Sequence, residues 1–267
     1  MHGLIDTSNK EGTSPHSRDI AVQVEGVSKH YGQIFAVSET SFQVPTGTIK
    51  GLVGSDGAGK TTLLRMIATM ITPSKGSIKI QGLDVAKHRA KVKHLIGYMP
   101  QRFGLYPDLT VMENLRFFMD IYGISRSQRQ ERVETYLGFT NLLPFLDRRA
   151  ADLSGGMKQK LGLACVLVHE PSVLILDEPT NGVDPVSRQE FWDMLLEMKR
   201  RGMTILISTA YLDEGEKCDS ILLMHQSRML AESTPEEIRS TYPSLEEAMI
   251  KRIEEADEST VHNGFKW

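Results

Sequence analysis

The sequence has few cysteines, little imbalance of charge and no long apolar run. Each of these absences excludes some classes of protein. Its 267 residues include two cysteines, Cys165 and Cys218, which lie far apart and without metal-ligand spacing. This usage gives no sign of a cysteine metal site and favours a reduced, cytosolic compartment. The formal net charge of -3 gives no argument for nucleic acid or an anionic membrane surface as the main partner, so we expect no nucleic-acid partner.

The apolar runs are short. The longest are LGLACVLV (Leu161–Val168) and VLIL (Val173–Leu176), whereas a helix needs about 20 apolar residues to span a bilayer. We therefore expect that the chain does not cross a membrane by itself. Residues 1–19 lack the apolar core of a secretory signal and are rich in polar and turn-forming types, which predicts a disordered leader.

What is present from Ile20 onward is an α/β pattern. Short β runs predict an antiparallel start that leads into a buried strand ending at Val53, and a helical period follows Gly54. Further strands are predicted at SIKI, LIGYM, VLILD, MTILIS and SILLM, most of them separated by stretches long enough for a helix. Helical patterns dominate about residues 102–160, which predicts a helical subdomain inserted in the α/β core. We predict one large domain over residues 20–246, without an internal repeat.

The C-terminal part, residues 247–267, is predicted to form a helix and a tail. Acidic and basic residues in LEEAMIKRIEEADE are spaced for an exposed helix. It can be a small docking helix or a solvated terminal helix, and the pattern favours the second.

The segment GSDGAGKT satisfies the G-x-x-x-x-G-K-[ST] pattern between a predicted strand and a predicted helix. Its glycines let successive backbone N–H groups point at phosphate oxygens, Lys60 adds a cation, and the Thr61 hydroxyl can join a Mg²⁺ shell. Asp56 is expected to weaken nucleotide binding unless its carboxylate points away. A simple glycine turn is the alternative, and the flanking strand and helix disfavour it. The predicted nucleotide-binding residues of this loop are Gly54, Ser55, Asp56, Gly57, Ala58, Gly59, Lys60, Thr61 and Thr62.

A second element for phosphate chemistry is VLILDEP, where a buried strand delivers two carboxylates at its carboxyl end. Asp177 can hold Mg²⁺ through water, and Glu178 can polarise the water that attacks a γ-phosphate. The alternative is an acidic exit from a strand, which the upstream phosphate loop disfavours.

The segment LSGGMKQK, residues 153–160, resembles the signature segment of ABC ATPases, and the resemblance extends over about residues 20–239. It implies a P-loop NTPase core in which Ser154, Gly155 and Gly156 bind the γ-phosphate of ATP held on an opposite subunit. ATP and Mg²⁺ would then lie between two nucleotide-binding domains, and a monomer would hydrolyse ATP poorly. The same segment is also a serine N-cap that opens a helix.

The resemblance assigns roles to four further positions. Tyr31 matches the aromatic residue that stacks on adenine, with a surface tyrosine as the alternative. Gln101 matches the glutamine that touches Mg²⁺ or the attacking water, and Asp184 the aspartate that crosses the dimer interface. Ala210 stands where the family usually has a histidine that hydrogen-bonds the γ-phosphate. Losing one such donor typically costs a factor of about 10²–10³ in rate, so we expect slow hydrolysis or reliance on a partner's site.

The stretch RFGLYPDLTVMENLRFFMDIYG after Gln101, together with YPSLEEAM, resembles the ATP-binding subunits of ABC-2 type exporters. This implies a transmembrane permease subunit as partner, outward transport, and a peripheral position on the cytoplasmic face of the cell membrane. The second nucleotide-binding domain can be a copy of this chain or a different chain. The candidate contacts to the permease are Leu105, Tyr106, Leu109, Phe117 and Phe118, each of which can instead be a core residue.

Two other functions remain open. A soluble, non-transport ABC ATPase would normally carry a coiled-coil insertion, a long linker or a second cassette, and none is evident. A regulatory or degenerate subunit that binds ATP without turnover is supported by Ala210. Because Glu178 is intact, the sequence favours an active ATPase.

Overall fold

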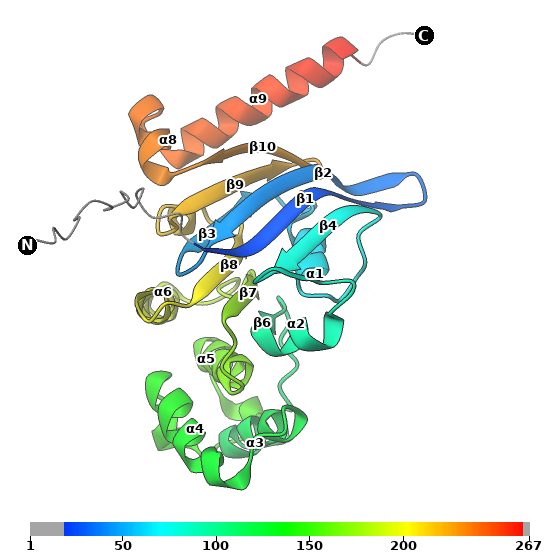
Figure 1. The fold of residues 1–267 in the computed structure, drawn as a ribbon. Helices are drawn as coiled ribbons and strands as arrows, with labels where there is room; N and C mark the ends of the chain where they lie inside the picture. The colour runs from blue at the N-terminus through cyan, green and yellow to red at the C-terminus, as the bar shows by residue number, and fades with distance from the viewer. Residues whose placement is uncertain (1–18, 264–267) are drawn as a thin grey trace, which may run out of the picture.

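The computed structural model describes residues 19–263, with side chains placed as far as residue 256. The predicted leader therefore lies almost entirely outside the described residues. Two sheets and their covering helices build the fold (Figure 1). No helix in this part of the chain is both long and apolar enough to cross a membrane.

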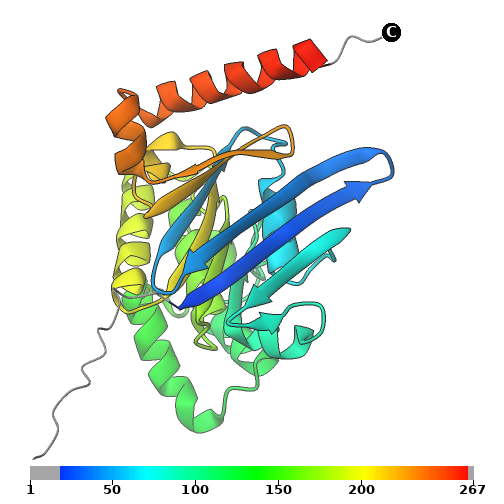
Figure 2. The same cartoon turned by 45° about the horizontal axis from the view of Figure 1, so that its top comes forward.

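A four-stranded antiparallel sheet has the order β2-β1-β4-β5, as the N-terminal β pattern predicted. In Figure 2 its long β1–β2 hairpin projects from the body of the molecule. The SIKI strand belongs to this sheet and not to the parallel one, because its alternating Ile78 and Ile80 pair with β1 and bury one face. Its strands are β1 (Ile20–Tyr31), β2 (Ile34–Pro45), β4 (Lys75–Ile80) and β5 (Leu83–Asp84).

The second sheet has six strands in the order β10-β9-β3-β8-β7-β6, and all but β10 run parallel to their neighbours. The edge strand β10 was not predicted, because its residues are only half-buried and lack a continuous apolar run. The strands are β3 (Ile49–Gly54), β6 (Ile96–Met99), β7 (Val173–Asp177), β8 (Thr204–Thr209), β9 (Ser220–His225) and β10 (Arg228–Ser233).

Both faces of this parallel sheet are covered, which explains the continuous apolar runs of its strands. On β7, Ile175 belongs to the cluster shared with α1 and the antiparallel sheet, whereas Leu174 and Leu176 belong to the cluster shared with α5 and α6. The sheet therefore fixes the helices that carry the loops at its carboxyl edge. The helices on these faces are α1 (Lys60–Ile67), α2 (Arg89–Leu95), α5 (Gly155–Leu167), α6 (Pro185–Arg200) and α7 (Leu212–Gly215).

The predicted helical insertion forms a subdomain at the end of the molecule opposite the last helix (Figure 1). It contains α3 (Val111–Ile121), α4 (Arg126–Phe139) and two 3-10 turns, Leu143–Phe145 and Ala150–Asp152, and it packs on α5 through its own apolar cluster. Thr110 and Glu113 form a reciprocal capping box at the start of α3. Because α5 contributes to two of the apolar clusters, it joins the subdomain to the core.

The C-terminal region contains α8 (Pro235–Thr241) and α9 (Leu245–Asn263). Leu245 and Ala248 at the start of α9 are buried, and later residues such as Ile250 are exposed. The first turn of the helix is thus packed on the domain, while its later part extends away from it (Figure 1).

Leu64→Ala should lower the free energy of unfolding by about 2–5 kcal/mol, since Leu64 is fully buried on α1 between the two sheets and its loss leaves a cavity. Denaturant unfolding of the two proteins measures the difference. Met70→Ala is the control, because Met70 is 56% exposed and its truncation should change stability by less than about 0.5 kcal/mol. Equal effects of the two substitutions would contradict the packing described for α1.

Candidate functional site

The phosphate loop is a tight connection between β3, which ends at Gly54, and α1, which begins at Lys60. Gly59, the N-cap of α1, has φ 101°, a conformation that favours glycine. A Cβ at this position would lie 2.4 Å from the carbonyl oxygen of Ala36 on β2. The antiparallel sheet therefore packs directly against the loop, and only glycine, which has no side chain, can occupy position 59.

A cavity of about 530 Å³ opens over this loop, which is within the usual size range of small-molecule sites. Asp56 is exposed and lines the cavity, so its carboxylate belongs to the cavity wall; its effect on nucleotide binding stays a prediction. The lining residues are Ile34, Phe35, Ala36, Asp56, Gly57, Ala58, Gly59, Lys60, Thr61, Thr62, Gln101, Glu178 and Ser227.

Lys60 is the buried cation of the cavity. Its Nζ donates hydrogen bonds to the carbonyl oxygens of Gly54 at 2.7 Å and Ser55 at 3.0 Å. The same atom lies 3.3 Å from Oε1 of Glu178. The structure thus brings the predicted phosphate-binding lysine and the predicted general base into one ion pair.

Glu178 is held by contacts on both sides. Its second oxygen, Oε2, accepts hydrogen bonds from Nε2 of Gln101 at 2.9 Å and Nδ2 of Asn181 at 3.2 Å. Its backbone has φ 49°, which is uncommon for a residue other than glycine, and its N–H donates to the carbonyl oxygen and to Oγ of Ser208. A strained, over-determined backbone of this kind is typical of functional positions.

Asp177 is fully buried, and its Oδ1 accepts hydrogen bonds from the hydroxyls of Thr61 at 3.0 Å and Ser208 at 2.7 Å. Its other oxygen, Oδ2, has no hydrogen-bond partner among the described residues. This carboxylate and the Thr61 hydroxyl fit a Mg²⁺ ion that takes its remaining ligands from water and phosphate. In the part of the chain that the structure describes, no cluster of three or more His, Cys, Asp or Glu side chains could hold a metal ion.

Gln101 lines the cavity over the phosphate loop and also a second cavity of about 390 Å³, whose other lining residues belong to the helical subdomain and α5. Of the five predicted permease contacts, Leu105 lines this second cavity. The aromatic rings of Tyr106 and Phe117 pack edge to face with centroids 4.5 Å apart, and Phe118 stacks on Phe103. Gln101 is therefore placed between the nucleotide cavity and the surface of the subdomain.

The signature residues lie outside the nucleotide cavity of their own chain. Ser154 is the N-cap of α5, and its Oγ accepts from the N–H of Met157 at 3.2 Å. A Cβ at Gly156 would lie 2.4 Å from Oγ of Ser187 on α6, whereas Gly155 is exposed with no atom within 4 Å of an added Cβ. The start of α5 is thus exposed at Ser154 and Gly155, and at Gly156 it packs closely against the start of α6.

Asp184 is the N-cap of α6, and its carboxylate accepts a hydrogen bond from the N–H of Ser187 at 2.9 Å. This hydrogen bond holds the pKa of Asp184 below its usual value. The local contact accounts for an aspartate at this position, and its expected role across a dimer interface stays a prediction.

Tyr31 lies at the end of β1, half-exposed, with Nζ of Lys29 5.0 Å from its ring centroid. It is not among the residues that line the nucleotide cavity, so its stacking on adenine stays a prediction. Phe35 and Ile34 do line the cavity and were missed; the only signal in the sequence was their apolar character beside a turn. Ser227, also missed, reaches the site because its Oγ donates to the carbonyl oxygen of Phe35 at 2.7 Å.

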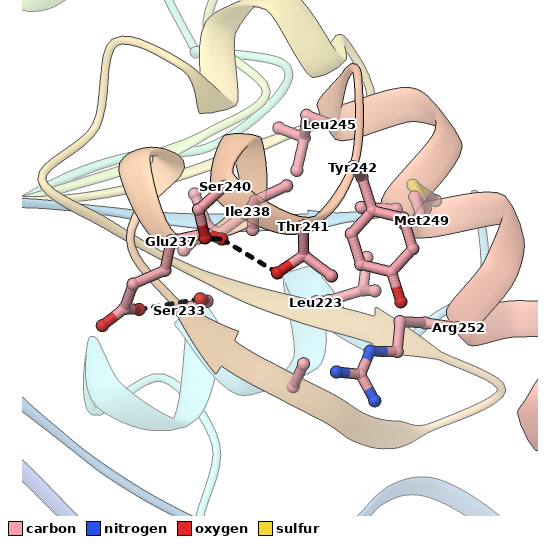
Figure 3. Close-up of a pocket in the computed structure, with 13 residues that line it drawn as sticks. Leu223, Ser233, Glu237, Ile238, Ser240, Thr241, Tyr242, Leu245, Met249 and Arg252 are labelled. Carbon is pink, nitrogen blue, oxygen red and sulfur yellow. Dashed lines mark hydrogen bonds between the residues drawn. The ribbon is translucent and has the colours of Figure 1, made fainter.

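A third cavity, of about 280 Å³, lies between the β9–β10 hairpin and α8 and α9. Figure 3 shows Leu223, Tyr242, Leu245 and Met249 around its apolar part, with Arg252 at one side. None of the residues predicted for nucleotide binding lines it. It is therefore separate from the phosphate chemistry.

Comparison with known proteins decides the family. Residues 37–181 match the profile described as ABC transporter, a region that contains Lys60, Gln101, Asp177 and Glu178. The chain belongs to the ABC transporter family.

This ABC ATP-binding domain is 47% identical over 225 residues to a probable multidrug ABC transporter ATP-binding protein, YbhF, of Escherichia coli (strain K12), covering 84% of this chain and 39% of that protein. It is 39% identical over 218 residues to Nod factor export ATP-binding protein I of Paraburkholderia xenovorans (strain LB400), covering 81% of this chain and 72% of that protein. The chain thus spans well under half the length of the first relative.

Solved structures agree with the fold. A structure of an ATP-binding subunit of an ABC transporter superposes with a TM-score of 0.78 at 31% identity, covering 87% of this chain and 99% of that one. The expected α/β P-loop architecture, with its antiparallel and helical additions, is thereby confirmed. The two relatives are named as ATP-binding proteins, and the solved structure is described as the ATP-binding subunit of an ABC transporter.

Gly156→Ala should destabilise the ABC domain by about 1–3 kcal/mol, because the added methyl group overlaps Ser187 and forces α5 and α6 apart. Thermal and denaturant unfolding measure the loss. Gly155→Ala is the matched control, since space is open at that position. Ser187→Gly should restore much of the stability of Gly156→Ala; a failure to do so would show that this contact is not the cause.

Proposed function

We propose that this chain is the ATP-binding and ATP-hydrolysing subunit of an ABC exporter. The observation that carries the proposal is the position of Glu178, whose carboxylate contacts both Lys60 and Gln101 at the wall of the cavity over the phosphate loop. Similarity to ATP-binding proteins named for multidrug and Nod factor export supports the direction of transport. In this proposal the membrane helices of the permease subunit select the cargo.

In the proposed mechanism, the phosphate loop and Lys60 hold the phosphates of ATP, and Phe35 and Ile34 provide apolar surface at the rim of the cavity. Asp177 and Thr61 would hold Mg²⁺, with Gln101 as the further predicted contact. The ion would supply positive charge to the phosphate oxygens when bound. Glu178 accepts a hydrogen bond from water and orients it for in-line attack, while Gln101 fixes the carboxylate.

A second nucleotide-binding domain completes the site in this proposal. Ser154, Gly155 and Gly156 do not line the cavity of their own chain, and the exposed start of α5 can offer its N–H groups to ATP on a partner. The partner domain can be a copy or a different chain. We place the assembly on the cytoplasmic face of the cell membrane, bound to a transmembrane permease through the surface beside Gln101.

The alternative is a subunit that binds ATP with little turnover. Its support is Ala210, which is exposed just after β8 and has no side-chain donor for a γ-phosphate. We favour slow hydrolysis over none, because Glu178 keeps both its cationic neighbour and its amide donors. A soluble ABC ATPase without a membrane partner is a further alternative, which co-purification with a permease would distinguish.

Asp177→Asn should weaken the binding of ATP in the presence of Mg²⁺ by about tenfold or more, on the order of 1.4 kcal/mol, while Mg²⁺-free binding changes much less. The reason is that an amide supplies neither the charge nor the second acceptor of the buried carboxylate. Calorimetric titration with and without Mg²⁺ measures the two affinities. An equal loss under both conditions would indicate a damaged loop and not a metal site.

Glu178→Gln should abolish steady-state Mg·ATP hydrolysis while ATP binding persists. Ala210→His should raise turnover at least about tenfold, because it restores one hydrogen-bond donor to the γ-phosphate. Hydrolysis should also rise with protein concentration, since the site is completed by a second domain. Turnover that survives Glu178→Gln would contradict the role of this carboxylate. An unmodified chain that binds ATP but stays inactive at every concentration, with activity gained in Ala210→His, would identify the degenerate subunit.

A further inference from the structure

Glu214, on the short helix α7, is a fully buried carboxylate that the sequence analysis did not single out. Its Oε1 accepts a hydrogen bond from the hydroxyl of Thr180 at 2.7 Å, and its Oε2 accepts one from the hydroxyl of Thr209 at 2.7 Å. Both threonines are themselves buried. Each carboxylate oxygen is therefore committed to a different loop at the carboxyl edge of the parallel sheet.

The first of these loops follows the general base. Thr180 comes two residues after Glu178, and the same turn supplies Asn181, whose amide bonds Oε2 of Glu178 at 3.2 Å. Hydrogen bonds from Asn181 N–H to the carbonyl of Glu178 and from Val183 N–H to the carbonyl of Thr180 continue the turn. A displacement of Thr180 would move the backbone that holds the Glu178 carboxylate.

The second loop carries the position where the family usually has a histidine. Thr209 is the last residue of β8, and its Oγ1 also accepts a hydrogen bond from the N–H of Tyr211 at 2.9 Å. The Thr209 hydroxyl therefore closes the turn around Ala210 while it donates to Glu214. In return, the N–H of Glu214 bonds the carbonyl of Tyr211 at 3.3 Å, so the carboxylate and the loop support each other.

A third element meets the same carboxylate. Arg188, in the first turns of α6, has its Nε 4.0 Å from Oε1 of Glu214 and its Nη2 3.4 Å from Asp213. Its guanidinium carbon also lies 4.7 Å from the ring centroid of Tyr211. Asp184 is the N-cap of this helix, so the buried group also reaches the segment expected at a dimer interface.

We propose that Glu214 is a positioning residue for ATP hydrolysis, which sets the loop after Glu178 and the turn at residue 210 relative to each other. The inference rests on the hydrolysis proposed above. A buried carboxylate that accepts hydrogen bonds from two separate loops fixes the position of one loop relative to the other. A base that orients water needs its position fixed in this way. Ala210 has no side-chain hydrogen-bond donor, so in this proposal the rate of hydrolysis depends more strongly on the position of Glu178.

The test compares Glu214→Gln with the unmodified chain in steady-state hydrolysis and in hydrogen exchange. Glutamine keeps the size of the side chain but loses its charge and one of its acceptors. We expect kcat to fall at least about tenfold with KM for Mg·ATP within about twofold, since the phosphate loop is untouched. We also expect the amides of residues 209–212 to exchange about tenfold faster, while those of α1 do not change.

Glu232→Gln is the matched control, because it removes the carboxylate partner of another buried charge, Lys50, away from the nucleotide cavity. It should lower stability without a selective loss of kcat. Thr209→Val removes the hydrogen bond from Thr209 to Glu214 and leaves the one from Thr180 in place. It should reduce the increase in turnover that Ala210→His produces, whereas Glu232→Gln should leave that increase unchanged.

Different results would overturn the two proposals. An unmodified chain without any turnover would count against the proposed hydrolysis, while the exchange measurement would still report on Glu214. Unchanged exchange at residues 209–212 in Glu214→Gln, or equal acceleration throughout the domain, would overturn the positioning role. So would a fall in kcat that Glu232→Gln reproduces.

Discussion

The buried carboxylate of Asp177 is the contact on which the arrangement of the site depends. It joins the first turn of α1, through Thr61, to β8, through Ser208, at the carboxyl end of β7. A fully buried carboxylate is costly unless hydrogen bonds compensate for its lost hydration. The parallel ladder holds the strand that delivers Glu178 in register with the strand that ends before Ala210, and the Asp177 carboxylate ties the phosphate loop to both.

The parts of this site that could be predicted from the sequence are formed by residues that are consecutive in the chain. The glycines and lysine of residues 54–61 and the adjacent carboxylates Asp177 and Glu178 are recognisable because strand, loop and helix follow directly in the chain. The same holds for Ser154, whose capping of α5 depends only on residues next to it in the chain. Their roles toward nucleotide and partner follow from the family and remain predictions for this chain.

What the sequence did not predict depends on contacts between distant segments. Ser227 reaches the nucleotide cavity through a hydrogen bond to Phe35, which lies far earlier in the chain. Glu214 stands among other acidic residues in YLDEGE, and nothing local distinguishes it from its exposed neighbours; only the fold buries it against Thr180 and Thr209. The strand β10 was missed for a related reason, since an edge strand that is half-buried leaves a weak apolar pattern.

The pairing of Lys60 with Glu178 links the binding of phosphate to the state of the base. The lysine is satisfied within its own loop by the carbonyls of Gly54 and Ser55, and its remaining contact is with the carboxylate. In the mechanism that we propose, a phosphate oxygen competes with Oε1 of Glu178 for this ammonium group. Because Gln101 and Asn181 continue to hold Oε2, the carboxylate stays in place while Oε1 becomes available to water. In this mechanism the phosphates take over the lysine while Oε2 stays held, so ATP binding removes one competitor for Oε1 without a large movement of the carboxylate.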